Sequence, residues 1–188
     1  MATNEHTDGE IVLESLKDKE QFAALIERYA ERLGRYVRRL GVKNDEDVQD
    51  LLQEIFLKTY QNLNAFDQSL SFSAWVYRIT HNEAISFFRK RNIRPEGNMV
   101  EDSEAILLLV RDEEDLREKI EQRSDAEHVN RALNTIAYKY KEVLVLRFFE
   151  QREYAEISDI LEIPMGSVAT LIHRAKKALH KELEYFTK

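Results

Sequence analysis

The chain has 188 residues but no cysteine, only two prolines and only five glycines. The lack of cysteine excludes disulfides and thiolate metal sites, and it is consistent with a reducing cytosol. Because glycine and proline are so scarce, the sequence can form few tight turns. This composition favours an all-α fold.

Long hydrophobic runs are also missing. No stretch reaches the roughly 18 consecutive apolar residues that a membrane span needs, and the N-terminal sequence MATNEHTDGE is too acidic and polar for a signal peptide. Hydrophobic residues make up 43% of the chain and charged residues 34%, so it can bury a core and stay in solution. We expect a soluble cytoplasmic protein without membrane insertion.

Signals of catalysis are lacking as well. No two of the five histidines have the i, i+4 spacing of a metalloprotease, and the sequence has no glycine-rich phosphate loop and no nucleophile elbow. The tripeptide HNE at 81–83 matches the H-x-E of nucleobase deaminases, but those enzymes also need a later cysteine pair. We therefore expect no enzyme, no cofactor and no metal.

Charge is distributed unevenly along the chain, whose net charge is −7. Residues 95–128 carry 12 acidic and 4 basic side chains, whereas the blocks 21–94 and 129–188 are mildly basic. Such a charge run is typical of a solvated linker with some helical tendency. The pattern predicts two small helical domains, 10–94 and 126–188, joined by an acidic linker over 95–125.

The first block predicts three helices. An unbroken apolar stripe over 22–40, with Ile26 among its residues, follows Asp18 as a candidate N-cap and ends at Gly41. The next helix begins after Asn44, has acids in its first turn, and continues to residue 63 with Tyr60 in its apolar stripe. Residues 64–71 predict a loop.

The third helix, 72–91, has two apolar faces instead of one. Trp75 lies on one face, Tyr77, His81 and Phe88 lie nearly opposite, and the helix ends in a basic run. One interpretation is a central helix buried on both sides. The other is a core stripe plus an aromatic–basic face, a composition that stacks unpaired bases and neutralises phosphates. Composition alone leaves both open.

The second block predicts four shorter helices, of which the last two are separated by the turn EIPM at 162–165. Such an arrangement is typical of a helix-turn-helix, whose second helix enters the major groove of DNA. An ordinary helical hairpin with solubilising basic residues is the alternative. In the last helix, periodicity places Val168, Ile172 and Ala175 inward. The outward residues are then Ser167, Ala169, Thr170, His173, Arg174 and Lys177.

Two segments together resemble a known family. DVQDLLQEIFLKTY with FDQSLSFSAWVYRITHNEAISFFRKR resembles region 2 of bacterial RNA polymerase sigma factors, and YKEVLVLRFFEQREYAEISDILEIPMGSVATLIHRAKKAL resembles their region 4. With nothing recognisable between them, the match is to the extracytoplasmic-function (ECF) type.

The resemblance implies roles for named residues. The second helix is expected to dock on the clamp helices of the largest polymerase subunit through Asp47, Asp50, Leu51, Gln53, Glu54 and Leu57. The loop and third helix are expected to recognise and melt the −10 element through Phe66, Asp67, Trp75, Tyr77, Arg78, His81, Asn82, Phe88, Arg89, Lys90, Arg91 and Arg94. The six outward residues of the last helix are expected to read the −35 element.

We thus expect a non-enzymatic sigma factor that brings core RNA polymerase to promoter DNA, in a stress or envelope response, with a cognate anti-sigma factor as a further partner that the resemblance implies. A stand-alone helix-turn-helix regulator would explain residues 126–188 but would not explain the two apolar faces of the helix at 72–91. A helical adaptor with no nucleic-acid role would explain the acidity but not the basic helix ends.

Overall fold

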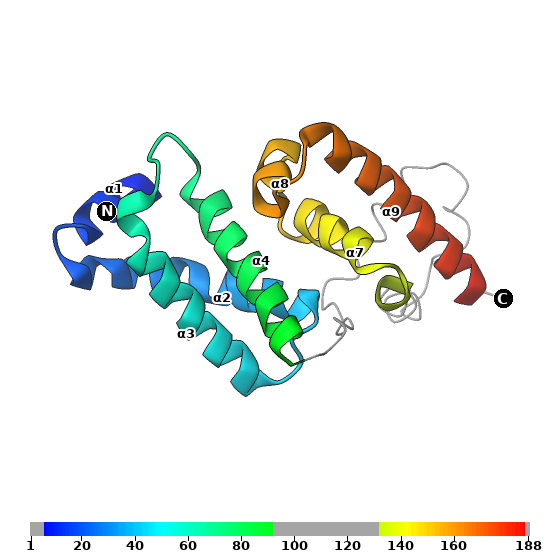
Figure 1. Cartoon of the computed structure of the whole chain (residues 1–188), viewed down its shortest axis with the longest axis horizontal. Helices are drawn as coiled ribbons and strands as arrows, with labels where there is room; N and C mark the ends of the chain where they lie inside the picture. Colours follow the sequence, from blue (N-terminus) through cyan, green and yellow to red (C-terminus); the bar gives the residue numbers. More distant parts are fainter. Residues whose placement is uncertain (1–5, 92–131, 187–188) are drawn as a thin grey trace, which may run out of the picture.

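The structure, a computed structural model, describes residues 6–91 and 132–186, with side chains up to residue 183. The predicted acidic linker and Arg94 lie outside these residues. Within the described ranges the regular elements are all helical, as the composition predicted. Figure 1 shows them as two groups, α1 to α4 and α7 to α9.

A first helix, α1 (Asp8–Ser15), was not predicted. Thr7 and Glu10 form a capping box: the Thr7 hydroxyl accepts from the Glu10 N–H, and the Glu10 carboxylate accepts from the Thr7 N–H at 2.7 Å. The helix is tied to the bundle by an ion pair of 2.5 Å between Asp8 and Arg28. The Thr-x-x-Glu spacing, typical of a capping box, is the sequence signal from which α1 could have been predicted.

The long helix α2 (Phe22–Leu40) follows a short 3-10 turn, η1 (Lys19–Gln21). Asp18 caps η1 rather than α2, because its carboxylate accepts from the N–H of Glu20. At the other end Gly41 has φ 130°, a conformation that side-chain-bearing residues rarely adopt. The predicted end of this helix at Gly41 is confirmed.

Helix α3 (Asp45–Gln61) begins where predicted, because the Asn44 side chain accepts a 2.8 Å hydrogen bond from the Glu46 N–H. A 3-10 turn, η2 (Leu63–Ala65), and a loop lead to α4 (Phe72–Lys90), which Ser71 caps. Helices α2, α3 and α4 pack against one another and bury most of the apolar stripes predicted for them.

The C-terminal group consists of α7 (Tyr138–Leu144), a π-helical turn η3 (Val145–Phe149), α8 (Tyr154–Leu161) and α9 (Met165–Phe186). Glu162 ends α8 in the left-handed conformation, and Ser158 donates a 2.6 Å hydrogen bond to the Ile163 carbonyl in the turn that follows. Helices α8 and α9 pack together as the two arms of the predicted helix-turn-helix.

The two groups touch directly, which the sequence analysis did not anticipate. Helix α4 packs along α8, and α2 meets η3. Figure 1 shows α4 at the boundary between the groups, with α8 and α7 beside it. The second apolar face of α4 therefore lies against the C-terminal group, and the core is continuous from one group to the other.

Candidate protein and nucleic-acid interfaces

The outer face of α9 is solvent-exposed. Its inner residues Val168, Ile172 and Ala175 are buried, at 0%, 3% and 0% exposure. Of the six residues predicted to face outward, five are exposed and Ser167 is half-buried. Helical periodicity thus placed all six on one side of the second helix of the helix-turn-helix, where residues can reach base edges in a major groove.

Helix α3 presents a polar, mostly acidic surface. Asp50, Gln53, Glu54 and Leu57 are exposed and Asp47 is half-buried. Leu51 is only 6% exposed, so its prediction as a surface contact is wrong in this structure: its side chain is part of the core. The surface residues lie on successive turns of one helix, which suits recognition of another helix.

An apolar groove runs beside this acidic surface, between α2 and α3. Its volume is about 610 Å³. Exposed apolar side chains on its walls include Ile26 and Tyr60, each 39% exposed, and Leu57 at 57%. The sequence analysis assigned Ile26 and Tyr60 to the buried stripes, because both sit at the edge of an apolar stripe, where periodicity does not separate core from rim.

The loop before α4 is built on an aromatic cluster. Phe66 is 8% exposed, with its ring centroid 5.5 Å from that of Phe72 and 5.0 Å from that of Trp75. The prediction that Phe66 contacts DNA is therefore wrong in this arrangement, because packing against two core rings occupies it. The neighbouring Asp67 is exposed, and a hydrogen bond from the Ser69 N–H lowers the pKa of its carboxyl.

The second face of α4 is buried. Tyr77, His81 and Phe88 are 0%, 8% and 4% exposed. The Phe88 ring lies 6.3 Å from that of Tyr138, and His81 Nε2 lies 3.8 Å from Glu142 Oε2. Here α4 is a central helix buried on both sides, the first of the two interpretations. In this arrangement these three rings are not accessible to bases, contrary to the expectation for a stacking face.

Polar residues along α4 and at its end remain partly or fully accessible. Asn82, Arg89, Lys90 and Arg91 are exposed, and Arg78 is half-buried. Arg91 pairs with Asp47 of α3 at 2.6 Å, which links the basic end of α4 to the acidic surface of α3.

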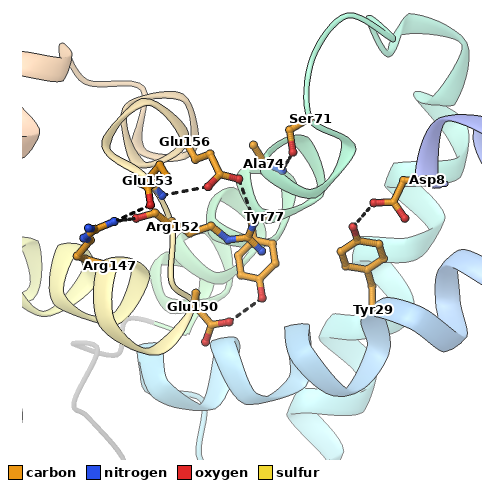
Figure 2. A network of polar contacts seen from close by, with 10 residues as sticks. All are labelled: Asp8, Tyr29, Ser71, Ala74, Tyr77, Arg147, Glu150, Arg152, Glu153 and Glu156. Atoms are coloured by element: carbon orange, nitrogen blue, oxygen red, sulfur yellow. Dashed lines mark hydrogen bonds and ion pairs between the residues drawn. The ribbon is translucent and has the colours of Figure 1, made fainter. Parts of the chain in front are cut away.

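A polar network joins the two groups of helices (Figure 2). Glu150, which follows η3, accepts from Arg39 Nη1 of α2 and from the Tyr77 hydroxyl of α4, both at 2.6 Å. The guanidinium of Arg152 lies 4.1 Å from the centre of the Tyr77 ring, and its Nη1 donates to Glu156 at 3.1 Å. Burial, and then the charge of Glu150, raise the pKa of Tyr77.

A second buried contact joins the same two groups. Burial lowers the pKa of His81 to about 4 and raises that of Glu142 to about 7. Between these values both side chains are uncharged, so their 3.8 Å approach is not an ion pair there. The Tyr36 hydroxyl lies 3.3 Å from His81 Nδ1 on the other side of the imidazole.

Within 6–91 and 132–186, no group of histidine, aspartate and glutamate side chains is placed to hold a metal ion. Nor does any helix of that part of the chain combine the length and the apolarity needed to span a lipid bilayer.

Comparisons with known proteins agree with the geometry. Residues 25–93 match the family Sigma-70 region 2, and residues 127–179 match the family Sigma-70, region 4. The RNA polymerase sigma-H factor of Pseudomonas aeruginosa is 30% identical over 177 residues, which cover 89% of this chain and 88% of that protein. The ECF RNA polymerase sigma factor SigW of Bacillus subtilis is 29% identical over 172 residues, or 88% and 90% of the two chains.

Solved structures share the fold. CnrH, solved in complex with the cytosolic domain of CnrY, matches with a TM-score of 0.68 and 23% identity over 95% of this chain and 97% of that one. The sigma factor RpoE of Bartonella quintana, solved with the anti-sigma factor NepR, matches with a TM-score of 0.63 and 19% identity over 88% and 98% of the chains. The chain belongs to the sigma-70 family of RNA polymerase sigma factors, in its extracytoplasmic-function group.

Proposed function

We propose that this sigma factor docks on core RNA polymerase through α3 and the α2–α3 groove, recognises the −10 element with α4 and the loop before it, and reads the −35 element with α9. It acts by binding alone in the cytoplasm, without catalysis of its own. The observation that carries the proposal is the exposed polar and basic face of α9, held by a helix-turn-helix that packs against a region 2 bundle.

Polymerase docking rests on the surface of α3. An acidic row containing Asp50 and Glu54 lies beside an apolar groove with Leu57 at its rim. A helix from a basic coiled coil fits such a surface, since its apolar residues enter the groove while its cations meet the carboxylates. Both features are open to solvent, so the surface is ready to bind without rearrangement.

Reading of the −35 element rests on α9. Residues near the start of the second helix of a helix-turn-helix approach base edges, which favours Ser167, Thr170 and Arg174. An arginine can bond both acceptors of a guanine, whereas Lys177, further along the helix, is placed for a backbone phosphate. Phosphate contacts position the protein, and the base contacts supply discrimination.

Recognition of the −10 element rests on the loop before α4 and on α4 itself. The exposed Asp67 and Asn82 offer hydrogen-bonding groups, and Arg89 and Lys90 offer positive charge for phosphates. The aromatic Tyr77 would add a stacking surface once it is uncovered.

We further propose that a cognate anti-sigma protein binds this chain. The support is that CnrH and the Bartonella RpoE were both solved with a bound partner, which in the second case is an anti-sigma factor. The exposed apolar groove between α2 and α3 gives such a partner an apolar surface to cover.

A gel-shift assay with and without core polymerase tests the proposed function. Promoter DNA is expected to shift only when this protein and core polymerase are both present. A shift by the protein alone would favour a stand-alone regulator, and no shift under either condition would favour an adaptor.

A further inference from the structure

We propose that Glu83 is a positioning residue for polymerase docking: it holds Lys58 toward α4 and thereby keeps the neighbouring carboxylate of Glu54 available to a cation of core polymerase. The inference rests on the proposed function, because it takes Glu54 to be part of the docking surface. It goes further by assigning a role to Glu83 and Lys58, neither of which was predicted to contact the polymerase.

Lys58 of α3 lies between two carboxylates. Its Nζ donates a hydrogen bond of 2.7 Å to Oε2 of Glu83 in α4, and it lies 3.4 Å from Oε1 of Glu54, one turn earlier in α3. Helices α3 and α4 pack against each other, and Figure 1 shows them side by side. One ammonium group therefore meets one carboxylate across the helix interface and a second one on its own helix.

The two carboxylates do not share this cation equally. The Glu83 side chain is 12% exposed, whereas that of Glu54 is 48% exposed. A largely buried carboxylate has lost most of its water, so it needs a counter-ion more than an exposed carboxylate does. The hydrogen bond to Glu83 is also the largest of the causes that raise the pKa of Lys58, and Glu54 contributes less. Lys58 therefore interacts mainly with Glu83.

Glu54 keeps its charge available because Glu83 holds Lys58. The 3.4 Å pair between Lys58 and Glu54 is longer than a charge-assisted hydrogen bond, which is about 2.7–2.9 Å. Together with Asp50, Glu54 also lines a cavity of about 210 Å³ between α3 and α4. A lysine or arginine side chain of the polymerase that enters this cavity would meet carboxylates from two successive turns of α3.

Loss of the Glu83 charge would turn Lys58 toward Glu54. A glutamate four residues before a lysine on one helix has the favourable order for an ion pair. The Lys58 side chain is 39% exposed and has a flexible stem, so it can make this movement without a change in the backbone. The closer pair would neutralise part of the acidic surface that is proposed to bind polymerase. Glu83 would thus control the affinity without touching the polymerase.

Binding of the full-length protein to core polymerase, measured by fluorescence anisotropy, tests the inference. Glu83→Gln keeps the size of the side chain and removes its charge. It is expected to weaken binding about threefold, which is the effect of one partly exposed ion pair. Adding Lys58→Met removes the cation that would cover Glu54, so the double variant is expected to bind with the affinity of the parent protein.

Two controls separate the position of Lys58 from the net charge of the protein. Glu153→Gln makes the same charge change at a side chain that is 75% exposed and pairs with Arg147 in the C-terminal group, so it should bind as the parent protein does. Glu83→Gln with Lys17→Met, at an exposed lysine, has the net charge of the restored variant but keeps Lys58, so its binding should stay weak. Circular dichroism checks folding, and Glu83→Ala replaces Glu83→Gln if that variant does not fold.

A purely structural role of Glu83 gives a different result. If Glu83→Gln weakened binding only by loosening the packing of α3 against α4, Lys58→Met would not restore it, because the second substitution removes another polar contact between these helices. An affinity of Glu83→Gln equal to that of the parent protein, or a loss that Lys58→Met does not reverse, would overturn the inference.

Two further measurements distinguish this inference from the proposed function. Glu54→Gln is expected to weaken polymerase binding, and normal binding of that variant would refute the docking role of Glu54. In the free protein, a double-mutant cycle in urea unfolding measures the coupling between Glu54 and Lys58. This coupling should be larger in Glu83→Gln than in the parent protein, whether or not polymerase binds. Equal coupling in both would show that Glu83 does not hold Lys58 away from Glu54, and would overturn the inference alone.

Discussion

The hydroxyl of Tyr77 donates a hydrogen bond to Oε2 of Glu150, 2.6 Å away, although 73 positions separate the two residues in the sequence. This bond joins the region 2 bundle to the segment that precedes the helix-turn-helix. The ring that the sequence analysis assigned to base stacking is a packing residue here, at 0% exposure. Its availability to DNA therefore depends on how the two regions are arranged.

The first prediction concerns polymerase docking. Charge reversal at Asp50 and Glu54 together is expected to abolish co-purification with core polymerase, because both carboxylates are exposed and are proposed to meet a basic surface of the polymerase. Helicity should be unchanged, since neither side chain is in the core. Asp159→Lys with Glu162→Lys gives the same change of net charge on exposed residues of the C-terminal group and should co-purify normally. Normal co-purification of the α3 variant would remove this assignment.

The second prediction concerns base reading by α9. Arg174→Ala is expected to relax the preference at one position of the −35 element, because a bidentate arginine–guanine contact contributes about 1–3 kcal/mol of discrimination. Lys177→Ala should instead weaken binding to all sequences alike and flatten the salt dependence. Binding of the holoenzyme to a library randomised in the −35 element measures both. An unchanged sequence logo for Arg174→Ala would contradict the role given to that residue.

The third prediction concerns the aromatic cluster before α4. Phe66→Ala is expected to lower the free energy of unfolding by about 3 kcal/mol or more, because it leaves a cavity between two core rings. Leu70→Ala, at a side chain that is 55% exposed, should stay within about 0.5 kcal/mol of the parent protein. Urea unfolding measures both. If the two variants are equally stable, Phe66 is not packed as described and is free to contact DNA.

The fourth prediction concerns pH. Burial raises the pKa of Glu142 from 4.5 to about 7, so between these values the folded protein binds more protons than the unfolded chain. The contribution of Glu142 to stability therefore falls as pH rises through this window. Glu142→Gln removes that loss. The free energy of unfolding of this variant, minus that of the parent protein, should therefore increase by at most about 3 kcal/mol as the pH rises from 4.5 to 8.

His81 acts in the opposite direction, since burial lowers its pKa from 6.5 to about 4. Stability is lost as pH falls through that window, because the unfolded chain takes up the proton first. Denaturant unfolding at several pH values should show this acid-side loss more clearly in Glu142→Gln than in the parent protein. A stability difference between the two proteins that does not vary with pH would mean that Glu142 is not buried as described.

Local sequence signals predicted the features that depend on neighbouring residues. The helical period predicted that Val168 and Ile172 of α9 are buried and that Thr170 and Arg174 are exposed. Residues that share a face of one helix can be predicted from their spacing alone. The end of α2 was predicted from Gly41, because glycine adopts a φ of 130° readily whereas residues with a side chain rarely do.

Features that depend on contacts between distant segments could not be predicted in the same way. Tyr77 and Phe88 have the same spacing whether they meet bases or a second domain, so periodicity could not choose between the two. Leu51 and Ile26 lie at the edges of apolar stripes, where a small rotation of the helix about its axis decides whether a side chain is buried or exposed. The apolar groove between α2 and α3 could therefore be found only from the packing of the two helices in the structure.

Selection from fully randomised duplex DNA tests the central claim most directly. Core polymerase, this protein, or both together capture fragments, which are then sequenced. We expect enrichment only with both proteins present, and two sequence blocks separated by about two turns of the duplex, since α4 and α9 are proposed to read different elements. A single block enriched by this protein alone, or no enrichment with both proteins present, would contradict its assignment as a promoter-directing subunit of RNA polymerase.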